Sequence, residues 1–186
     1  MFRVKNVVQL AARMIGVEEM TDGYFNGSVS EEGARIVQGL VNCFNLVENE
    51  LAVDYLPLVC EDTLSTDEEG VIEYARLSKK IAYVIAVHDE WGNRACEKRM
   101  PTHVKLEPGK YVVRYAALPT EKGAEDFCEY EAGVSERLMA YGVAAEYCLH
   151  KGLYAEHAAW DKKYRDALAA ACKSRKGVQL KERAWI

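Results

Sequence analysis

With 186 residues, the chain is long enough for one well-packed domain, or for one domain that carries a sizeable insertion. Its composition, 49% apolar and 28% charged, is ordinary for a soluble globular protein. The net charge of -5 argues against a general nucleic-acid-binding protein, because phosphate recognition needs a basic surface.

The cysteines and the N-terminal segment indicate a protein that stays in a reducing compartment. No two cysteines form a CxxC pair, and three lie in patterns where a small apolar residue would serve as well, as buried reduced cysteines do. Residues 1–20 have no apolar core long enough for a signal peptide. No apolar run approaches the roughly twenty residues that span a bilayer. We therefore expect a soluble, non-secreted protein with no membrane partner.

The first third of the chain predicts helices. Residues 4–15 place apolar side chains at three- and four-residue steps, which is the spacing of one helical face. Two dipeptides that contain glycine, between residues 22 and 27, predict a turn-rich loop. A helix start follows at Ser30, and its apolar stripe continues to about Val53, shortly before Pro57.

The middle third predicts an antiparallel sheet built from hairpins. Residues 71–76 alternate in pattern, and residues 81–87 are rich in the β-branched and aromatic side chains of strands. A turn at 89–93 predicts a return strand at 94–99.

A second hairpin is expected further along the chain. The proline and glycine of residues 107–110 have the chemistry of a tight turn. The turn predicts that strands at 102–106 and 111–117 pair with each other.

The segment from residue 134 to residue 173 predicts two amphipathic helices joined by a tight turn. Ser135 precedes the first helix and can cap it, because its hydroxyl can accept an otherwise unpaired backbone N–H. Gly152 follows the first helix, where a left-handed residue is needed and only glycine adopts that conformation without a steric cost.

Together these elements predict an α+β fold, a helical bundle with an inserted antiparallel β-sheet domain and a C-terminal tail. The N-terminal helices of the bundle occupy residues 1–57 and the inserted β domain residues 58–119. The helical pair that completes the bundle occupies residues 120–177, and the tail residues 178–186.

The sequence contains no motif for catalysis or for a cofactor. It has no GxSxG, no GxxxxGK[ST] and no GxGxxG after a predicted strand. The four histidines lack the dense Cys/His spacing of a zinc site. We therefore expect a protein that is not an enzyme and holds no cofactor and no metal. An enzyme would need a pocket that gathers His88, His103 or a pair of carboxylates.

Aromatic residues on the predicted strands allow one further interpretation. Tyr83, Tyr111 and Tyr115 could form a stacking surface for single-stranded nucleic acid. Tyrosines that alternate on a sheet are more often part of a core or an interface, and the chain is acidic.

Charge is distributed unevenly along the chain. The acidic segment, residues 61–69, has no basic residue and contains Glu61, Asp62, Asp67, Glu68 and Glu69. Residues 173–186 are basic instead. Two interpretations stay open: both segments are solvated surface, or the basic segment binds an acidic partner.

The helical pair and the order of elements resemble a known family. The stretch AAEYCLHKGLYAEHAAWDKKYRDALAAA, residues 144–171, is similar to the C-terminal hairpin of the head-to-tail adaptor, or tubular tail A (gatekeeper), proteins of short-tailed bacteriophages. The layout covers most of the chain, and the similar residues lie between Tyr141 and Ala171. The resemblance implies a structural virion protein, made in the cytoplasm of the bacterial host.

The resemblance also implies a set of partners. Such adaptors form a ring, typically dodecameric, between the portal protein and a downstream tail or nozzle protein. Double-stranded DNA passes through the channel of the ring without sequence-specific binding. A cyclic ring needs two different, complementary patches on each subunit.

Two groups of residues receive roles from the resemblance. The tail would contact the portal or a neighbouring subunit, with Trp185 as its anchor, because aromatic residues dominate interface hot spots. The contacting residues would be Gln179, Leu180, Lys181, Arg183, Trp185 and Ile186. The acidic segment would line the channel or face a partner, and an acidic lining would keep DNA from sticking. The alternative is a non-enzymatic protein-interaction module built on the helical hairpin and absent from virus particles.

Overall fold

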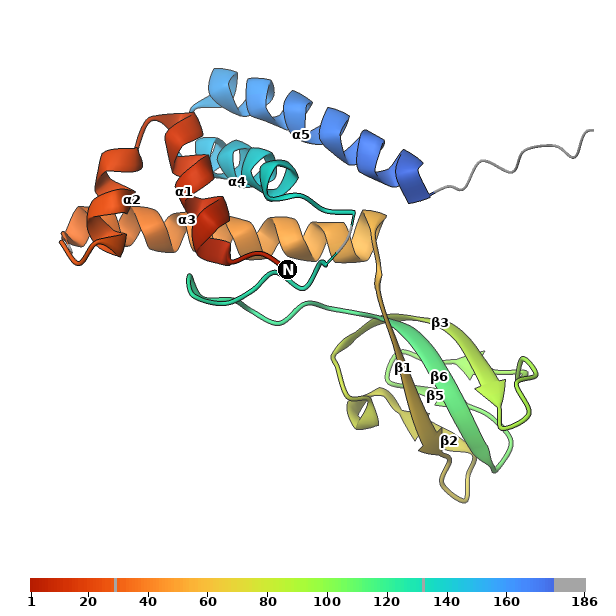
Figure 1. Cartoon of the computed structure of the whole chain (residues 1–186). Helices are drawn as coiled ribbons and strands as arrows, with labels where there is room; N and C mark the ends of the chain where they lie inside the picture. The colour runs from red at the N-terminus through yellow and green to blue at the C-terminus, as the bar shows by residue number, and fades with distance from the viewer. Residues whose placement is uncertain (29, 132, 176–186) are drawn as a thin grey trace, which may run out of the picture. The chain divides into compact units, whose positions relative to one another are not determined.

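The computed structural model describes residues 1–28, 30–131 and 133–175 (Figure 1). It has the α+β fold that the sequence predicts. The chain divides into two compact units: one joins Met1–Val47 with the chain from Lys122 onward, and the other is Glu48–Glu121. The β segment expected at 58–119 lies inside the second unit. The tail expected at 178–186 lies outside the described residues.

The first unit, called the helical unit below, is built from five helices in its described part. They are α1 (Val4–Ile15), α2 (Glu18–Phe25), α3 (Glu31–Glu50), α4 (Glu136–His150) and α5 (Tyr154–Arg175). The last residues of α3 already count with the second unit. A π-helical turn, Leu51–Tyr55, continues α3, so the helix expected to reach about Val53 ends close to its predicted position.

Helix α1 forms where its apolar spacing predicts, and a segment far along the chain caps it. Its apolar face is fully buried. The first amides of a helix have no partner within the helix. Here Val4 N donates to Asp126 O at 2.9 Å, and Lys5 N donates to Ala124 O at 2.8 Å. The charged stretch that follows the β segment is therefore bound to the start of the chain.

Helix α2 shows that the turn-rich loop expected at residues 22–27 is wrong over most of its length. Asp22 favours turns because its carboxylate can bond to its own backbone. In the structure, that carboxylate instead accepts a hydrogen bond from Gln9 Nε2 of α1 at 2.9 Å. Thr21 is fully buried and donates to Glu18 O at 3.0 Å. The tertiary contacts with α1 therefore outweigh the local turn preference, and the left-handed glycine comes only at Gly27.

The helical pair expected at residues 134–173 is confirmed as α4 and α5. Ser135 Oγ accepts from Leu138 N at 3.1 Å, which is the predicted N-cap. Gly152 has a φ of 73°, the left-handed conformation expected after α4. Helix α4 packs against α1 and α5 and is buried on nearly all sides, whereas α5 keeps much of its surface exposed. Helix α4 is therefore the interior helix of the unit.

The second unit, called the β unit below, contains two three-stranded antiparallel sheets. One sheet has the order β1-β6-β3 and the other β2-β5-β4. The strands are β1 (Leu58–Ser65), β2 (Val71–Glu73), β3 (Ile81–Asp89), β4 (Lys98–Arg99), β5 (His103–Lys105) and β6 (Lys110–Ala117). A short 3-10 helix, Tyr74–Arg76, follows β2, where alternation alone predicted more strand.

Both sheets contribute to one core. Val84, Val87 and Val113 from the first sheet belong to the same buried cluster as Ile72 and Val104 from the second. Because side chains on a strand alternate between two faces, each sheet gives one face to this cluster and keeps the other outside. The alternation of side chains along the predicted strands therefore reflects a core that lies against one face of each sheet.

The hairpin expected around residues 107–110 is wrong, because its two strands belong to different sheets. Leu106 is buried in the shared core and its N–H donates to Gly70 O at 2.7 Å. The turn itself is bound to the end of β1, since Thr66 N donates to Gly109 O at 2.9 Å. The proline and glycine therefore mark a crossing between sheets, a difference that turn chemistry cannot show.

The return strand expected at residues 94–99 forms only in part. Arg94 makes one isolated bridge with His88, and β4 is two residues long. The Arg99 guanidinium donates to Val84 O at 2.6 Å and Ile85 O at 3.2 Å, next to a register irregularity in β3. This side chain replaces the backbone pairing that a full return strand would supply.

The packing of α4 gives a first test. A methyl group on Gly142 would come within 2.8 Å of Val47 Cγ1 and 3.0 Å of the Tyr164 ring, and both neighbours are buried. We expect Gly142→Ala to lower the free energy of unfolding by roughly 1–3 kcal/mol through overpacking. The measurement is urea unfolding. Gly23→Ala is the matched control: the same change in α2 meets only Ser28 O at 3.6 Å and should stabilise by up to about 1 kcal/mol.

Candidate interaction surfaces

The acidic segment does not form one continuous acidic face. Its first two carboxylates lie on β1 rather than on a loop and point to opposite faces of the sheet. Glu61 lies on the outer face, where its carboxylate is 3.5 Å from Arg114 Nε of β6 and both side chains are about half exposed. Asp67 Oδ1 accepts from Glu69 N at 3.0 Å and Val71 N at 2.7 Å and thereby shapes the turn after β1.

Asp62 lies on the inner face of its sheet, where hydrogen bonds hold its carboxylate. Its carboxylate accepts hydrogen bonds from Ser78 N at 2.6 Å, Ser78 Oγ at 2.9 Å and Tyr115 Oη at 2.9 Å. Tyr115 is fully buried, and its oxygen accepts from Lys79 N at 3.1 Å. Burial raises the pKa of the Asp62 carboxyl, but these hydrogen bonds outweigh it and hold the pKa below its ordinary value. Asp62 therefore fixes the loop before β3.

Two acidic residues of the segment stay available for a partner. Glu68 and Glu69 are exposed and make no ion pair with the described part of the chain. The tail residues proposed as an interface, from Gln179 to Ile186, lie outside the described residues. Glu68 and Glu69 are therefore the two acidic residues of this segment whose carboxylates are exposed and without an ion pair or a hydrogen bond among the described residues.

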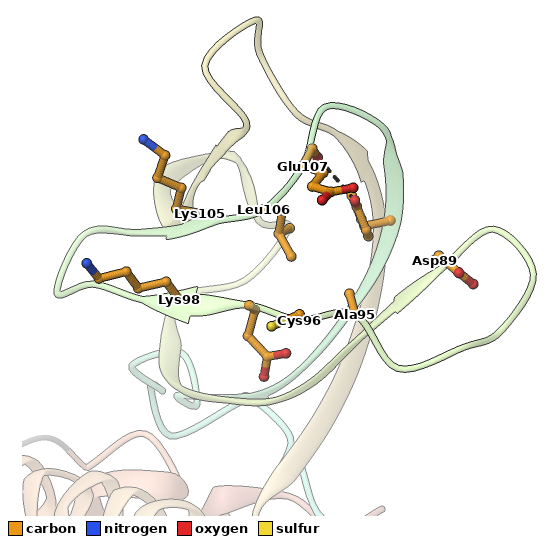
Figure 2. A pocket seen from close by; sticks show the side chains of 9 residues that line it. Asp89, Ala95, Cys96, Lys98, Lys105, Leu106 and Glu107 are labelled. Atoms are coloured by element: carbon orange, nitrogen blue, oxygen red, sulfur yellow. Dashed lines mark hydrogen bonds between the residues drawn. The ribbon is translucent and has the colours of Figure 1, made fainter.

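The β unit has a hollow of about 440 Å³ beside its second sheet (Figure 2). Its walls include Leu106, the exposed Cys96 and several charged side chains. Lys98 and Lys105 face each other directly across β4 and β5. Figure 2 shows both lysines extending in the same direction, while Asp89 lies at the opposite end of the hollow. Like charges in directly opposite positions destabilise a strand pair.

The tyrosines and histidines do not assemble the sites considered from the sequence. Tyr83 is exposed on the outer face of its sheet, whereas Tyr115 belongs to the core and Tyr111 packs against it, so the three do not share a stacking surface. His88 and His103 lie in different sheets, and neither lines the hollow. Among the described residues, no three His, Cys, Asp or Glu side chains gather as metal ligands would.

The helical unit has a groove that the sequence did not predict. It is about 490 Å³ in volume and is called the helical groove below. Two distant parts of the sequence, residues 15–36 and 147–153, line it, namely through Ile15, Val17, Glu32, Arg35, Ile36, Tyr147, Cys148, Lys151 and Leu153. Its walls are largely apolar, and its charged lining residues are Arg35, Lys151 and Glu32. The Lys151 ammonium lies 5.3 Å from the centre of the Tyr147 ring.

A smaller hollow of about 230 Å³ shares Arg35, Tyr147 and Lys151 with the groove. Cys43 lines it, with Sγ 3.8 Å from His150 Nδ1. Burial raises the pKa of the Cys43 thiol to about 12, with a smaller contribution from the Glu146 carboxylate. A thiol in this state is a poor nucleophile at neutral pH. Cys43 is therefore part of the wall of this hollow and not a reactive thiol.

Trp91 is the second feature that sequence reasoning passed over. It lies in the turn after β3 and is 78% exposed. The turn itself, at residues 89–93, was predicted and is confirmed: Asp89 N donates to Asn93 O at 2.9 Å. The sequence could have indicated the exposure of Trp91, because the tryptophan stands between the acidic pair Asp89-Glu90 and Gly92 in a short polar turn.

No family model matches this sequence, and the search of curated proteins found no match. No described helix has the length and apolar character to cross a bilayer.

The Asp62 network predicts a pH-dependent stability. We expect Asp62→Asn to lower the free energy of unfolding by roughly 1–3 kcal/mol at neutral pH, because the substitution removes charged hydrogen bonds to Ser78 and Tyr115. The folded pKa of Asp62 is lowered. Its contribution is therefore fully present above the ordinary aspartate pKa of about 3.9 and is lost as the pH falls through the folded value.

Urea unfolding at neutral pH and near pH 3 measures this difference. The gap between wild type and Asp62→Asn should narrow in acid. Glu61→Gln is the matched control: it is the adjacent residue, its ion pair is exposed, and its removal should cost no more than about 1 kcal/mol. A gap that stays constant across this pH range would contradict the assigned role.

Proposed function

We propose that this chain is a structural virion protein, a head-to-tail adaptor that forms a ring between a portal protein and a tail or nozzle protein. The observation that carries the proposal is the resemblance of residues 144–171 to the C-terminal hairpin of that family. It gains support from the fold, because this hairpin belongs to a helical unit into which a β unit is inserted. An inserted β-rich domain in a helical bundle is what the resemblance implies.

The kind of surface on the molecule also favours an assembly protein. Its exposed features include an apolar groove lined by Arg35, Lys151 and Glu32, a tryptophan that is 78% exposed, and two adjacent glutamates. Such features are typical of protein interfaces, because aromatic and arginine side chains are enriched there. In the proposed ring, Glu68 and Glu69 face the channel or the next component, and DNA passes without sequence-specific contact.

The helical groove equally suits the second candidate, a non-enzymatic interaction module that binds a partner outside a particle. The two candidates differ in where the protein is found. An adaptor is present in every particle in a fixed, small copy number, whereas a free module is absent from purified particles.

Quantitative mass spectrometry of purified particles tests the proposal. The particles come from the culture that produces this protein, and the major capsid protein serves as the internal reference. We expect about twelve copies per particle, because a closed cyclic ring fixes its own stoichiometry. Absence of the chain from particles would refute the adaptor function and favour the interaction module.

Removal of residues 178–186 is a second test. We expect the truncated chain to keep its melting temperature and to lose incorporation into particles, because the removed segment acts only in the contact with the portal. The single substitution Trp185→Ala should reproduce most of the loss, as hot-spot tryptophans do. Normal incorporation of the truncated chain would contradict the role of the tail.

A further inference from the structure

The turn that carries Trp91 is held rigidly by one carboxylate. Asp89 Oδ1 accepts from Trp91 N at 3.0 Å and from Asn93 N at 2.8 Å, and Oδ2 accepts from Asn93 Nδ2 at 3.1 Å. Gly92 supplies the left-handed residue, with a φ of 84°. The backbone that presents Trp91 is therefore fixed before any contact forms. A preorganised backbone reduces the conformational entropy that the turn loses on binding.

The exposure of Trp91 indicates a contact surface. At 78%, it is the most exposed of the large hydrophobic side chains in the described part of the chain. Aromatic side chains of this size bury roughly 150–250 Å² when they are covered. A ring held in water on a rigid turn is thus an anchor that the fold itself does not use.

The helical groove fits this anchor in chemistry and in size. Its volume of about 490 Å³ lies within the usual range of ligand pockets, about 300–1,000 Å³. Ile15, Val17, Ile36 and Leu153 supply apolar walls. Leu153 is 45% exposed although it lines the groove. The walls can therefore bury more apolar surface when an indole ring enters.

The charged residues beside Trp91 and beside the groove favour one orientation of the two surfaces. Glu90 precedes Trp91, is exposed, and makes no ion pair among the residues described. The groove is lined by two basic residues, Arg35 and Lys151, and by one acidic residue, Glu32. Arg35 has only a solvent-exposed partner, Glu31, at 3.6 Å. An acidic residue beside an aromatic anchor matches an apolar groove whose lining has one more basic than acidic residue.

We propose that Trp91 of one copy inserts into the helical groove of a second copy, with Glu90 placed against Arg35 and Lys151. The proposal rests on the ring proposed above and names its contact between subunits. The anchor and the groove are different surfaces, so each copy offers one of each. Such a heterologous contact continues from copy to copy and closes into a ring where the rotation allows it.

Sedimentation of the full chain tests the contact over a concentration series up to about 1 mM. The wild-type chain associates with rising concentration. Trp91→Ala weakens this association at least tenfold, as loss of a hot-spot residue does. Tyr83→Ala is the matched control: it removes another exposed aromatic ring of the same unit, from a β-sheet face, and leaves the association unchanged.

Mixing two variants makes the test directional. Leu153→Arg places a charge in the groove at a half-exposed position and keeps the anchor intact, whereas Trp91→Ala keeps the groove intact. Each variant alone associates at least tenfold more weakly than the wild type and is monomeric at the concentration chosen for mixing. Their mixture forms one-to-one dimers that do not grow further, because each pair has one intact anchor and one intact groove. A mixture that stays monomeric would overturn the proposal.

Charge exchange keeps the test decisive if Leu153→Arg fails to fold. Glu90→Arg and Arg35→Glu each weaken association, and equal amounts of the two single variants or the double variant restore it in part. A wild-type chain that stays monomeric throughout, or variants that associate as the wild type does, would overturn the contact. The particle copy number is independent of these results, so the adaptor function and this contact can fail separately.

Discussion

A pair of hydrogen bonds from one side chain joins the two chain segments of the helical unit at the point where the β unit is inserted. Asn45 of α3 lies just before the β unit leaves the helices, and Lys122 follows directly after it returns. The Asn45 amide donates to Lys122 O at 3.0 Å, and Lys122 N donates to Asn45 Oδ1 at 2.8 Å. The Lys122 ammonium also lies 2.9 Å from the nearly buried Glu129 carboxylate. These contacts hold the two ends of the insertion together and so offset the entropy of closing a long loop.

Sequence reasoning succeeded where local chemistry and the global fold agree. The three-to-four spacing of α1, the serine cap of α4 and the glycine after it are local signals, and the structure uses each as predicted. It failed where distant contacts decide the outcome. The carboxylate of Asp22 finds Gln9 and so permits a helix, and β6 pairs with β1 and β3 rather than with β5. Strand partners are chosen by the shared core, which no single stretch of sequence contains.

The candidate surfaces were harder to foresee than the fold, for reasons that can be named. The acidic segment looked uniform in sequence, but a strand turns adjacent residues to opposite faces, so Glu61 and Asp62 have different partners. The helical groove takes its walls from α1, α3 and α4 with their connecting residues, and α4 lies more than eighty residues after α3 in the sequence. Trp91 could have been recognised, because a tryptophan in a tight polar turn has no route to the core.

The interior position of α4 has a consequence for folding during synthesis on the ribosome. Helices α1 and α3 leave the ribosome early, but the helix that covers their apolar faces is made only after the whole β unit. The carbonyls that cap α1 arrive equally late. At roughly 5–20 residues per second, the nascent N-terminal helices stay uncovered for several seconds. Newly made chains therefore pass through a stage in which the apolar faces of α1 and α3 have no α4 to cover them.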